Sequence, residues 1–174
     1  MLLELLRVWR DFFIVAATAG ATLIGAMFVV VSIAVGIITQ ERAAASHAYL
    51  TSTVAHLGAV LLASILTMAP ALDWSSFGVV LVGGGVVGIV YVALLSRTVG
   101  RFSVDWTDTL WYTALPIVGY LGIAGSGVLS LAVNFHAVEL LAVASVLVLI
   151  CGVRNAWDMI LIFAMRPRPP QPPL

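Results

Sequence analysis

Long apolar runs dominate this chain, and they constrain its fold more than any other feature. The first, Phe12–Gln40, contains no Asp, Glu, Lys, Arg or His in 29 residues. A helix needs about 20 apolar residues to cross the hydrocarbon core of a bilayer. The further runs that reach or approach this length are 49–71, 74–96, 109–133 and 135–153. The sequence therefore predicts an all-α fold, a polytopic transmembrane bundle of five helices.

The composition leaves no room for a folded soluble domain. Charged residues make up 9% of the chain and hydrophobic residues 62%, whereas a soluble domain carries about 25% charged residues. We expect one five-helix transmembrane domain over residues 12–165, an N-terminal interfacial segment over 1–11 and a Pro-rich tail over 166–174. The formal net charge is +0, so nothing indicates a nucleic-acid partner. The lipid bilayer is the expected surrounding.

The arginines predict the orientation of the chain. Cytoplasmic loops of membrane proteins are enriched in Lys and Arg. With five spans, one side of the membrane receives Arg42, Arg97, Arg101, Arg154, Arg166 and Arg168, and the other receives Arg7 and Arg10. We therefore expect a cytoplasmic C-terminus and an outer N-terminus, unless the segment 1–11 lies flat in the interface.

The first run carries a stripe of small and hydroxyl residues at alternating steps of four and three. Its members are Thr18, Thr22, Gly25, Val29, Ser32, Gly36 and Thr39. This spacing places them on one face of a helix. Small residues in membrane helices mark where backbones approach closely. We expect the stripe to face protein, as a helix–helix seam, or a water-filled pore or cavity, and not lipid.

One ionisable residue, His56, lies well inside the second run. An ionisable side chain at membrane depth is by default a candidate functional residue. It can carry a proton or contact a ligand, with an unperturbed pKa of about 6.5. It can equally be a neutral, structural residue that hydrogen-bonds a neighbouring helix, because burial disfavours the charged imidazole.

Glycines and one proline mark the third and fourth runs. Residues 83–88 read GGGVVG, which matches the G-x-G-x-x-G nucleotide fingerprint by letters alone. That fingerprint needs a strand–turn–helix unit, and these apolar flanks provide none, so we expect no nucleotide. We expect Gly84 and Gly88 to form a close-packing face instead. In the fourth run, Pro116 and the glycines after it predict a kink or a broken helix.

The last run carries two pairs of polar residues and the lone cysteine. His136 and Glu139, three residues apart, can hold a metal or relay a proton, or can simply sit at the interface in the first turn of a helix. Arg154 and Asp158, four residues apart, can form an ion pair at the cytoplasmic interface. Cys151 is expected to be a buried, inert thiol.

Two stretches, GATLIGAMFVVVS (Gly20–Ser32) and RNAWD (Arg154–Asp158), resemble the first and last spans of small, largely uncharacterised bacterial multi-pass inner-membrane proteins. The resemblance covers about a tenth of the chain. It implies a location in the bacterial inner (plasma) membrane and no activity.

Three functions fit these patterns. The first is an accessory or scaffold subunit that packs in a homo-oligomer or a larger membrane complex. The second is a small oligomeric channel or transporter, with a pore lined by the stripe of the first run. The third is an intramembrane metal or proton site built on His56, His136 and Glu139. No nucleophile–base pair and no complete ligand set is present in the sequence, so we expect neither a cofactor nor an enzymatic activity.

Overall fold

The computed structural model describes residues 2–34, 40–70, 73–99 and 106–164. These residues form helices and short connections and contain no strand, so the predicted all-α class is confirmed. The helices are α1 (Leu2–Val8), α2 (Arg10–Ala34), α3 (Gln40–Thr67), α4 (Trp74–Val99), α5 (Trp106–Thr109), the π-helical segment η1 (Leu110–Ala114), α6 (Leu115–Leu131) and α7 (His136–Ala164).

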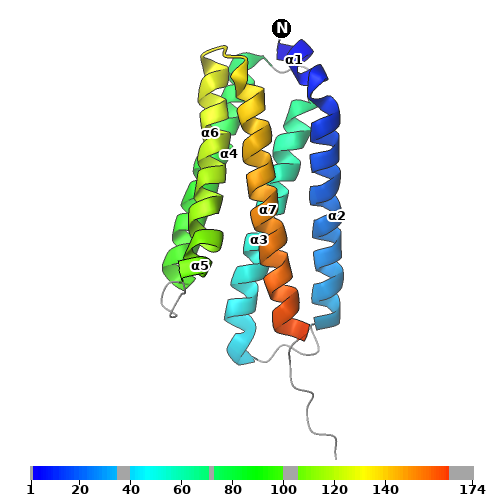
Figure 1. Cartoon of the computed structure of the whole chain (residues 1–174), viewed down its shortest axis with the longest axis vertical. Helices are drawn as coiled ribbons and strands as arrows, with labels where there is room; N and C mark the ends of the chain where they lie inside the picture. The colour runs from blue at the N-terminus through cyan, green and yellow to red at the C-terminus, as the bar shows by residue number, and fades with distance from the viewer. Residues whose placement is uncertain (1, 35–39, 71–72, 100–105, 165–174) are drawn as a thin grey trace, which may run out of the picture.

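The long helices run alternately up and down one bundle (Figure 1). α4 packs most extensively on α6, α6 packs on α7, and α3 packs on both α2 and α7. Helix α7 therefore lies centrally, and α2 and α4 lie on opposite flanks. The consecutive helices α3 and α4 touch much less than these pairs do, which leaves space between them.

Four helical stretches are long and apolar enough to cross a membrane: Arg10–Ile33, Trp74–Arg97, Leu110–Leu131 and His136–Leu161. Their length and composition suit a membrane protein. The apolar part of α3 that can be assessed, Thr51–Thr67, is shorter. Four of the five predicted spans thus have a matching helix of spanning length, and a fifth span stays a prediction.

The ends of the helices differ from the ends of the apolar runs. The first run extends to Gln40, whereas α2 ends at Ala34 and residues 35–39 lie outside the described part. The last run ends at Val153, whereas α7 continues to Ala164. The tail 166–174 also lies outside the described residues.

Asn134 stands before α7, and Asn is among the residues that favour the N-cap of a helix, so the sequence predicts a cap at this position. The His136 backbone N–H donates to Asn134 Oδ1 at 2.9 Å, and the Ala137 N–H donates to the Asn134 carbonyl at 3.2 Å. These bonds satisfy amide groups that the first turn of a helix leaves unpaired. The predicted cap is confirmed.

Pro116 is accommodated without a break in α6. The Leu115 N–H donates to the Leu110 carbonyl, the i→i−5 bond of a π-turn. Pro116 then occupies the first turn of α6, where a missing N–H disrupts least. The irregularity predicted in the fourth run is therefore a π-turn ahead of the proline, and α6 itself is continuous over Leu115–Leu131.

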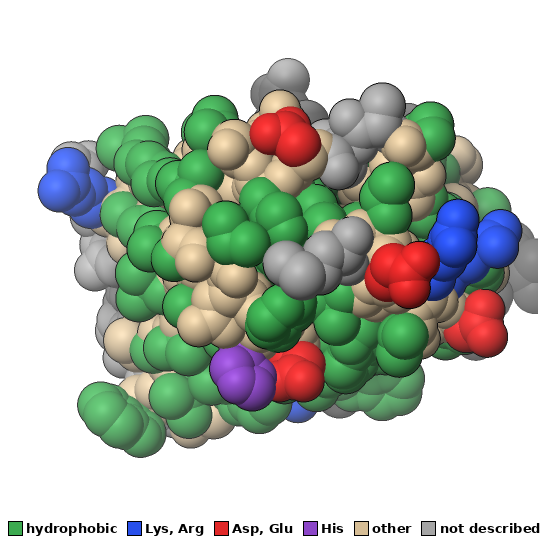
Figure 2. Space-filling view, turned by 90° about the horizontal axis from the view of Figure 1, so that it is seen from above, with side chains coloured by type: hydrophobic (Ala, Val, Ile, Leu, Met, Phe, Trp, Pro, Cys, Tyr) green, Lys and Arg blue, Asp and Glu red, His purple; other side chains and the backbone are tan. Residues whose placement is uncertain are grey.

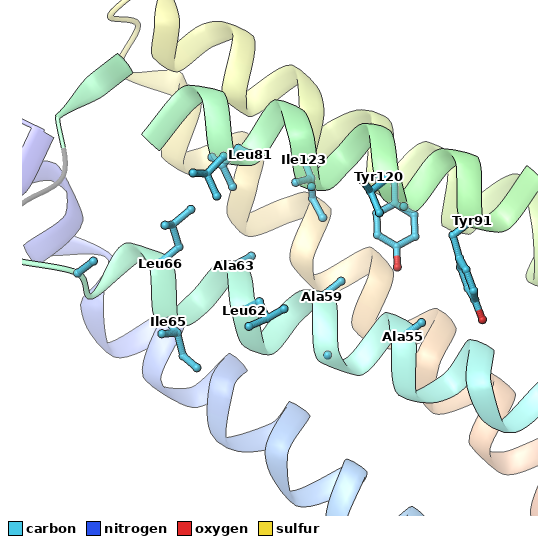
Figure 3. Close-up of a pocket in the computed structure, with 16 residues that line it drawn as sticks. Ala55, Ala59, Leu62, Ala63, Ile65, Leu66, Leu81, Tyr91, Tyr120 and Ile123 are labelled. Carbon is cyan, nitrogen blue, oxygen red and sulfur yellow. The ribbon is translucent and has the colours of Figure 1, made fainter. Parts of the chain in front are cut away.

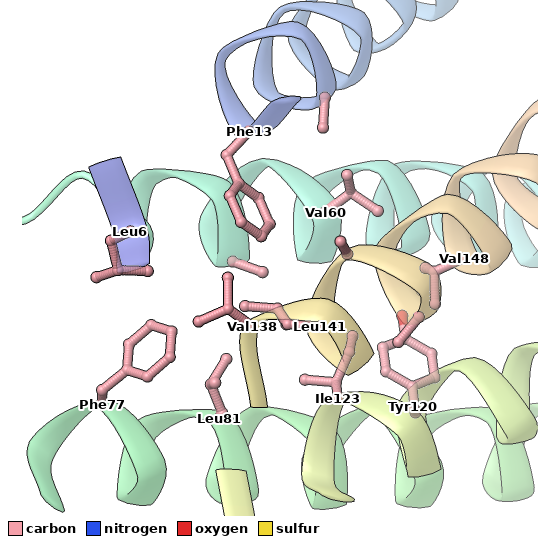
Figure 4. Close-up of a cluster of buried hydrophobic side chains, with 14 of the residues drawn as sticks. Leu6, Phe13, Val60, Phe77, Leu81, Tyr120, Ile123, Val138, Leu141 and Val148 are labelled. Atoms are coloured by element: carbon pink, nitrogen blue, oxygen red, sulfur yellow. The ribbon is translucent and has the colours of Figure 1, made fainter. Parts of the chain in front are cut away.

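Apolar side chains from every long helix meet between the helices (Figure 4). Phe13 of α2, Val60 of α3, Phe77 of α4 and Leu141 of α7 are 0% exposed. Helix α1, within the segment predicted to be interfacial, also buries Leu2 and Leu6 in this cluster. Seen from above, this end of the bundle carries scattered charged side chains among many hydrophobic ones (Figure 2).

Candidate functional site

The most unusual feature of the interior is a chain of polar side chains that links three helices. His56 of α3 is fully buried. Its Nδ1 lies 2.9 Å from the Tyr120 hydroxyl of α6, and its Nε2 lies 3.2 Å from Ser52 Oγ, one turn earlier on α3. Asn155 of α7 extends the chain, because its Nδ2 donates to Ser52 Oγ at 3.3 Å. Both ring nitrogens of His56 therefore have a hydroxyl partner.

Two proton arrangements satisfy this chain. Ser52 can donate to Nε2 while Nδ1–H donates to the Tyr120 oxygen, or Tyr120 can donate to Nδ1 while Nε2–H donates to Ser52. Each arrangement needs a neutral imidazole with one N–H. A protonated ring would carry a charge with no carboxylate partner among its described contacts. The geometry favours a neutral, structural His56 that ties α3 to α6.

The chain ends on an unpaired atom. Asn155 is 0% exposed, and its Oδ1 has no hydrogen-bond partner among the described residues. An amide that keeps one donor bond and leaves its acceptor unpaired costs stability in a low-dielectric interior. The sequence pattern did not single out Asn155, which directly follows Arg154 after the last apolar run.

The stripe of the first span faces outward from α2. Thr18, Thr22, Gly25, Val29 and Ser32 are all exposed, and a Cβ built on Gly25 would meet nothing within 4 Å. The face of α2 that packs on the bundle instead carries Phe13, Ala16, Gly20 and Met27. Gly36 and Thr39 lie outside the described residues. If the stripe faces protein, that protein is another chain.

Two hydroxyls of this stripe, the first and the last in its described part, are already bonded. Thr18 Oγ1 donates to the Ile14 carbonyl and Ser32 Oγ to the Phe28 carbonyl, both at 2.8 Å. Such bonds to the preceding turn satisfy a hydroxyl without water. The stripe can therefore pack against apolar surroundings.

The two pairs on α7 each lie within contact distance, at different depths. His136 Nδ1 lies 2.8 Å from Glu139 Oε2 on an exposed first turn. Arg154 Nε lies 3.1 Å from Asp158 Oδ2, which also accepts a hydrogen bond of 2.5 Å from Tyr112. The sequence also offers Asp105 and Asp108 as partners for Arg154. Asp105 and the side chain of Asp108 lie outside the described residues.

The three residues of the proposed intramembrane site do not come together. His56 is buried at the α3–α6 contact, whereas His136 and Glu139 are exposed at the start of α7. Within the described residues, no three His, Cys, Asp or Glu side chains cluster as metal ligands would. Cys151 is buried.

Of the predicted close-packing pair on α4, Gly88 packs against α6 and Gly84 does not, and Gly78 and Gly85 also pack closely on α6. A Cβ on Gly85 would lie 2.6 Å from the Ala124 nitrogen, and one on Gly78 would lie 2.8 Å from the Gly127 carbonyl oxygen, both on α6. Gly88 lies under the Tyr120 ring. A Cβ on Gly84 would meet nothing within 4 Å, so the prediction that Gly84 packs closely within the chain is wrong.

No protein-family model, curated protein or solved structure matches this chain. The function therefore has to be argued from the geometry of the chain itself.

Proposed function

We propose that the chain is an integral membrane subunit that assembles into a homo-oligomer through the outer face of α2. The observation that supports this most directly is the exposed stripe of Thr18, Thr22, Gly25 and Ser32. In the most apolar window of α2 only 17% of residues are buried, against 50% in α7. Helix α2 is thus the span with most surface left for a partner.

The composition of the stripe suits a helix partner better than lipid. Lipid tails are as apolar as Leu, so they provide no reason to place small residues on an outer face. A Gly inside a helix costs about 1 kcal/mol relative to Ala, and no described residue of the chain needs the space at Gly25. A second helix crossing at Gly25 would use that space through close backbone contact.

A pore lined by the stripe is the weaker alternative. Its hydroxyls would have to face water, whereas Thr18 and Ser32 bond their own helix. A transporter based on His56 has no support from the apolar pocket between α3 and α4, because His56 is not among the residues that line this pocket. A scaffold role needs neither water nor a titrating group.

We further propose that α3 is the fifth span and that the C-terminus is cytoplasmic. α3 has 28 residues, about 42 Å of helix, which exceeds the roughly 30 Å of hydrocarbon. It lies beside α2 and α7, both of spanning length. The arginine distribution supports the orientation, and the resemblance of Gly20–Ser32 and Arg154–Asp158 supports a bacterial inner membrane.

Disulfide trapping tests the assembly. In a Cys151→Ala background, Thr22→Cys should cross-link two copies in native membranes, because disulfides form only at Cα separations of about 4.4–6.8 Å. The neighbouring Ala21→Cys is also exposed but lies off the stripe, so it should cross-link much less. Equal cross-linking at both positions would contradict a specific interface.

A size measurement completes the test. Gly25→Leu should shift the purified protein from oligomer to monomer, while Gly83→Leu, the same change at an open glycine of α4, should not. Single-molecule photobleaching in nanodiscs counts the copies. A wild-type protein that is monomeric at every lipid dilution would overturn the proposal.

A further inference from the structure

A large apolar pocket lies between α3 and α4 (Figure 3). Its volume is about 780 Å³. Ala55, Ala59 and Ala63 form part of the α3 wall, and Tyr120 and Ile123 of α6 also line it. It carries no charged side chain. It falls within the depth of the α4 span, Trp74–Arg97.

Two glycines widen this pocket without serving the chain's own packing. A Cβ on Gly58 of α3 or on Gly84 of α4 would meet nothing within 4 Å, and both residues line the pocket. Gly83, next in sequence, is equally open but does not line it. At these two positions the pocket therefore reaches the backbone of its walls.

The dimensions of the pocket fit a hydrocarbon chain and not a helix. From Ala55 to Leu66 along α3 it spans about 16.5 Å. Dividing the volume of about 780 Å³ by this length gives a mean cross-section of about 47 Å². A helix of about 10 Å diameter needs about 80 Å². An alkyl chain, whose carbons touch neighbours at about 4 Å, needs on the order of 20 Å².

One polar group, the Tyr91 hydroxyl, distinguishes one end of the pocket from the other. The Tyr91 hydroxyl is buried at the Ala55 end of the pocket and has no hydrogen-bond partner among the described residues. A buried hydroxyl without a partner is costly, so an occupant that supplies an acceptor there would gain a hydrogen bond. Tyr91 lies six residues before Arg97 on α4, about 9 Å along the helix. That depth is close to the ester region of the leaflet on the Arg97 side.

We propose that this pocket binds one fatty-acyl chain of a membrane phospholipid, with the ester carbonyl accepting a hydrogen bond from Tyr91. The chain runs from Tyr91 past Gly84 toward Ala69. The pocket is longer than the roughly 15 Å of hydrocarbon in one leaflet, so the bound chain is extended. The glycerol and headgroup lie on the side of Arg97, outside the pocket.

Photolabelling tests the site in the intact chain. The protein is reconstituted in nanodiscs with a phosphatidylglycerol that carries a diazirine midway along its palmitoyl chain, illuminated, digested and sequenced by mass spectrometry. Labelling should concentrate on pocket residues such as Ala59 and Gly84, relative to Val79 and Val86, which are exposed on α4 but do not line the pocket. Uniform labelling of both sets would overturn the proposal.

Matched variants make the test specific. Gly84→Leu fills the pocket and should lower pocket labelling about 10-fold or more, whereas Gly83→Leu should leave it unchanged. Tyr91→Phe keeps the ring and removes the donor, so it should lower labelling about 2- to 10-fold. Loss of labelling in Gly83→Leu as large as in Gly84→Leu would refute the assignment.

Competition distinguishes other occupants. Unlabelled phosphatidylglycerol should reduce pocket labelling at lower concentrations than decyl-ubiquinone does. If decyl-ubiquinone competed at the lower concentration, the pocket would bind a quinone and not an acyl chain. A disulfide between two copies of a Gly84→Cys, Cys151→Ala variant would show that a second copy covers the pocket, against the proposal. Because Gly25→Leu leaves the pocket intact, it should not alter this labelling even if it dissolves the oligomer.

Discussion

Replacing Gly85 by alanine should weaken the bundle, although the same change one residue earlier should strengthen it. A Cβ on Gly85 would lie 2.6 Å from the Ala124 nitrogen, 2.7 Å from its Cβ and 2.8 Å from the Tyr120 carbonyl oxygen. Two of these three atoms are backbone atoms of α6, so no side-chain rotation relieves the clash. A Cβ on Gly84 would meet nothing within 4 Å.

The magnitude follows from two opposing terms. Gly→Ala in a helix gains about 1 kcal/mol from backbone propensity, and both variants share this gain. Carbon atoms prefer separations of about 3.5–4.0 Å, so α4 and α6 would have to move apart by about 1 Å at Gly85. Overpacking of this kind costs about 1–3 kcal/mol. We expect Gly84→Ala to be about 1–3 kcal/mol more stable than Gly85→Ala.

The assay is reversible unfolding by SDS in mixed micelles, followed by far-UV circular dichroism. The unfolding free energies of wild type, Gly84→Ala and Gly85→Ala are compared at one detergent composition. Membrane helices associate largely through close packing, so a loosened α4–α6 contact should appear directly in this free energy. If the unfolding free energies of the two variants shifted equally and in the same direction, close packing of α4 on α6 at Gly85 would be refuted.

Three further predictions use the same assay. Tyr120→Phe leaves a ring nitrogen of buried His56 without its partner at 2.9 Å and should cost about 1–3 kcal/mol; no loss would mean that the bond is not made. Asp73 Oδ1 accepts from the Ser76 N–H at 3.3 Å. Hydrogen bonding to the Ser76 side chain, and secondarily to this N–H, lowers the pKa of Asp73 below its usual 3.8. Its ionised form therefore stabilises the start of α4 above about pH 4, so Asp73→Ala should lower stability at pH 7, and the difference should vanish as pH falls through the folded pKa. Val133 adopts φ 54° at the end of α6, which costs about 1–2 kcal/mol for a residue with a Cβ, so Val133→Gly should stabilise, and a destabilised variant would contradict the strain.

The fold class could be predicted because length and hydrophobicity act locally. Each apolar run matches a helix, and Asn134 caps α7 as its side chain predicts. The end of the last run was placed at Val153 because Arg154 follows it. In the structure α7 continues because Arg154 and Asp158 lie 3.1 Å apart on one face, and Asp158 also accepts from Tyr112. Paired charges end an apolar run in the sequence without ending the helix.

The interior contacts could not be predicted, because they depend on which helices are neighbours. His56 could be recognised from its depth, but its partners Tyr120 and Asn155 lie on α6 and α7. Glycine faces fail for a related reason: successive residues differ by about 100° around a helix. Whether Gly84 or Gly85 packs closely therefore depends on which helix lies beside α4, and a single sequence does not show this. Tyr91 was missed because a tyrosine near a span end usually marks only the interface.

Apart from Gly20 and Gly125, which are in between, the described glycines fall into two groups, and the division separates the proposals. A Cβ would come within 3.0 Å of another part of the chain at Gly78, Gly85, Gly88, Gly119, Gly122, Gly127 and Gly152. The open glycines are Gly25, Gly58, Gly83 and Gly84. An open glycine costs about 1 kcal/mol of helix stability relative to Ala, and no close contact among the described residues offsets this cost. This supports an outside partner at α2 and a lipid chain in the pocket. Gly83 belongs to neither surface. If Gly83→Leu disturbed assembly or labelling as much as Gly25→Leu or Gly84→Leu, open glycines would carry no information, and both proposals would lose their shared premise.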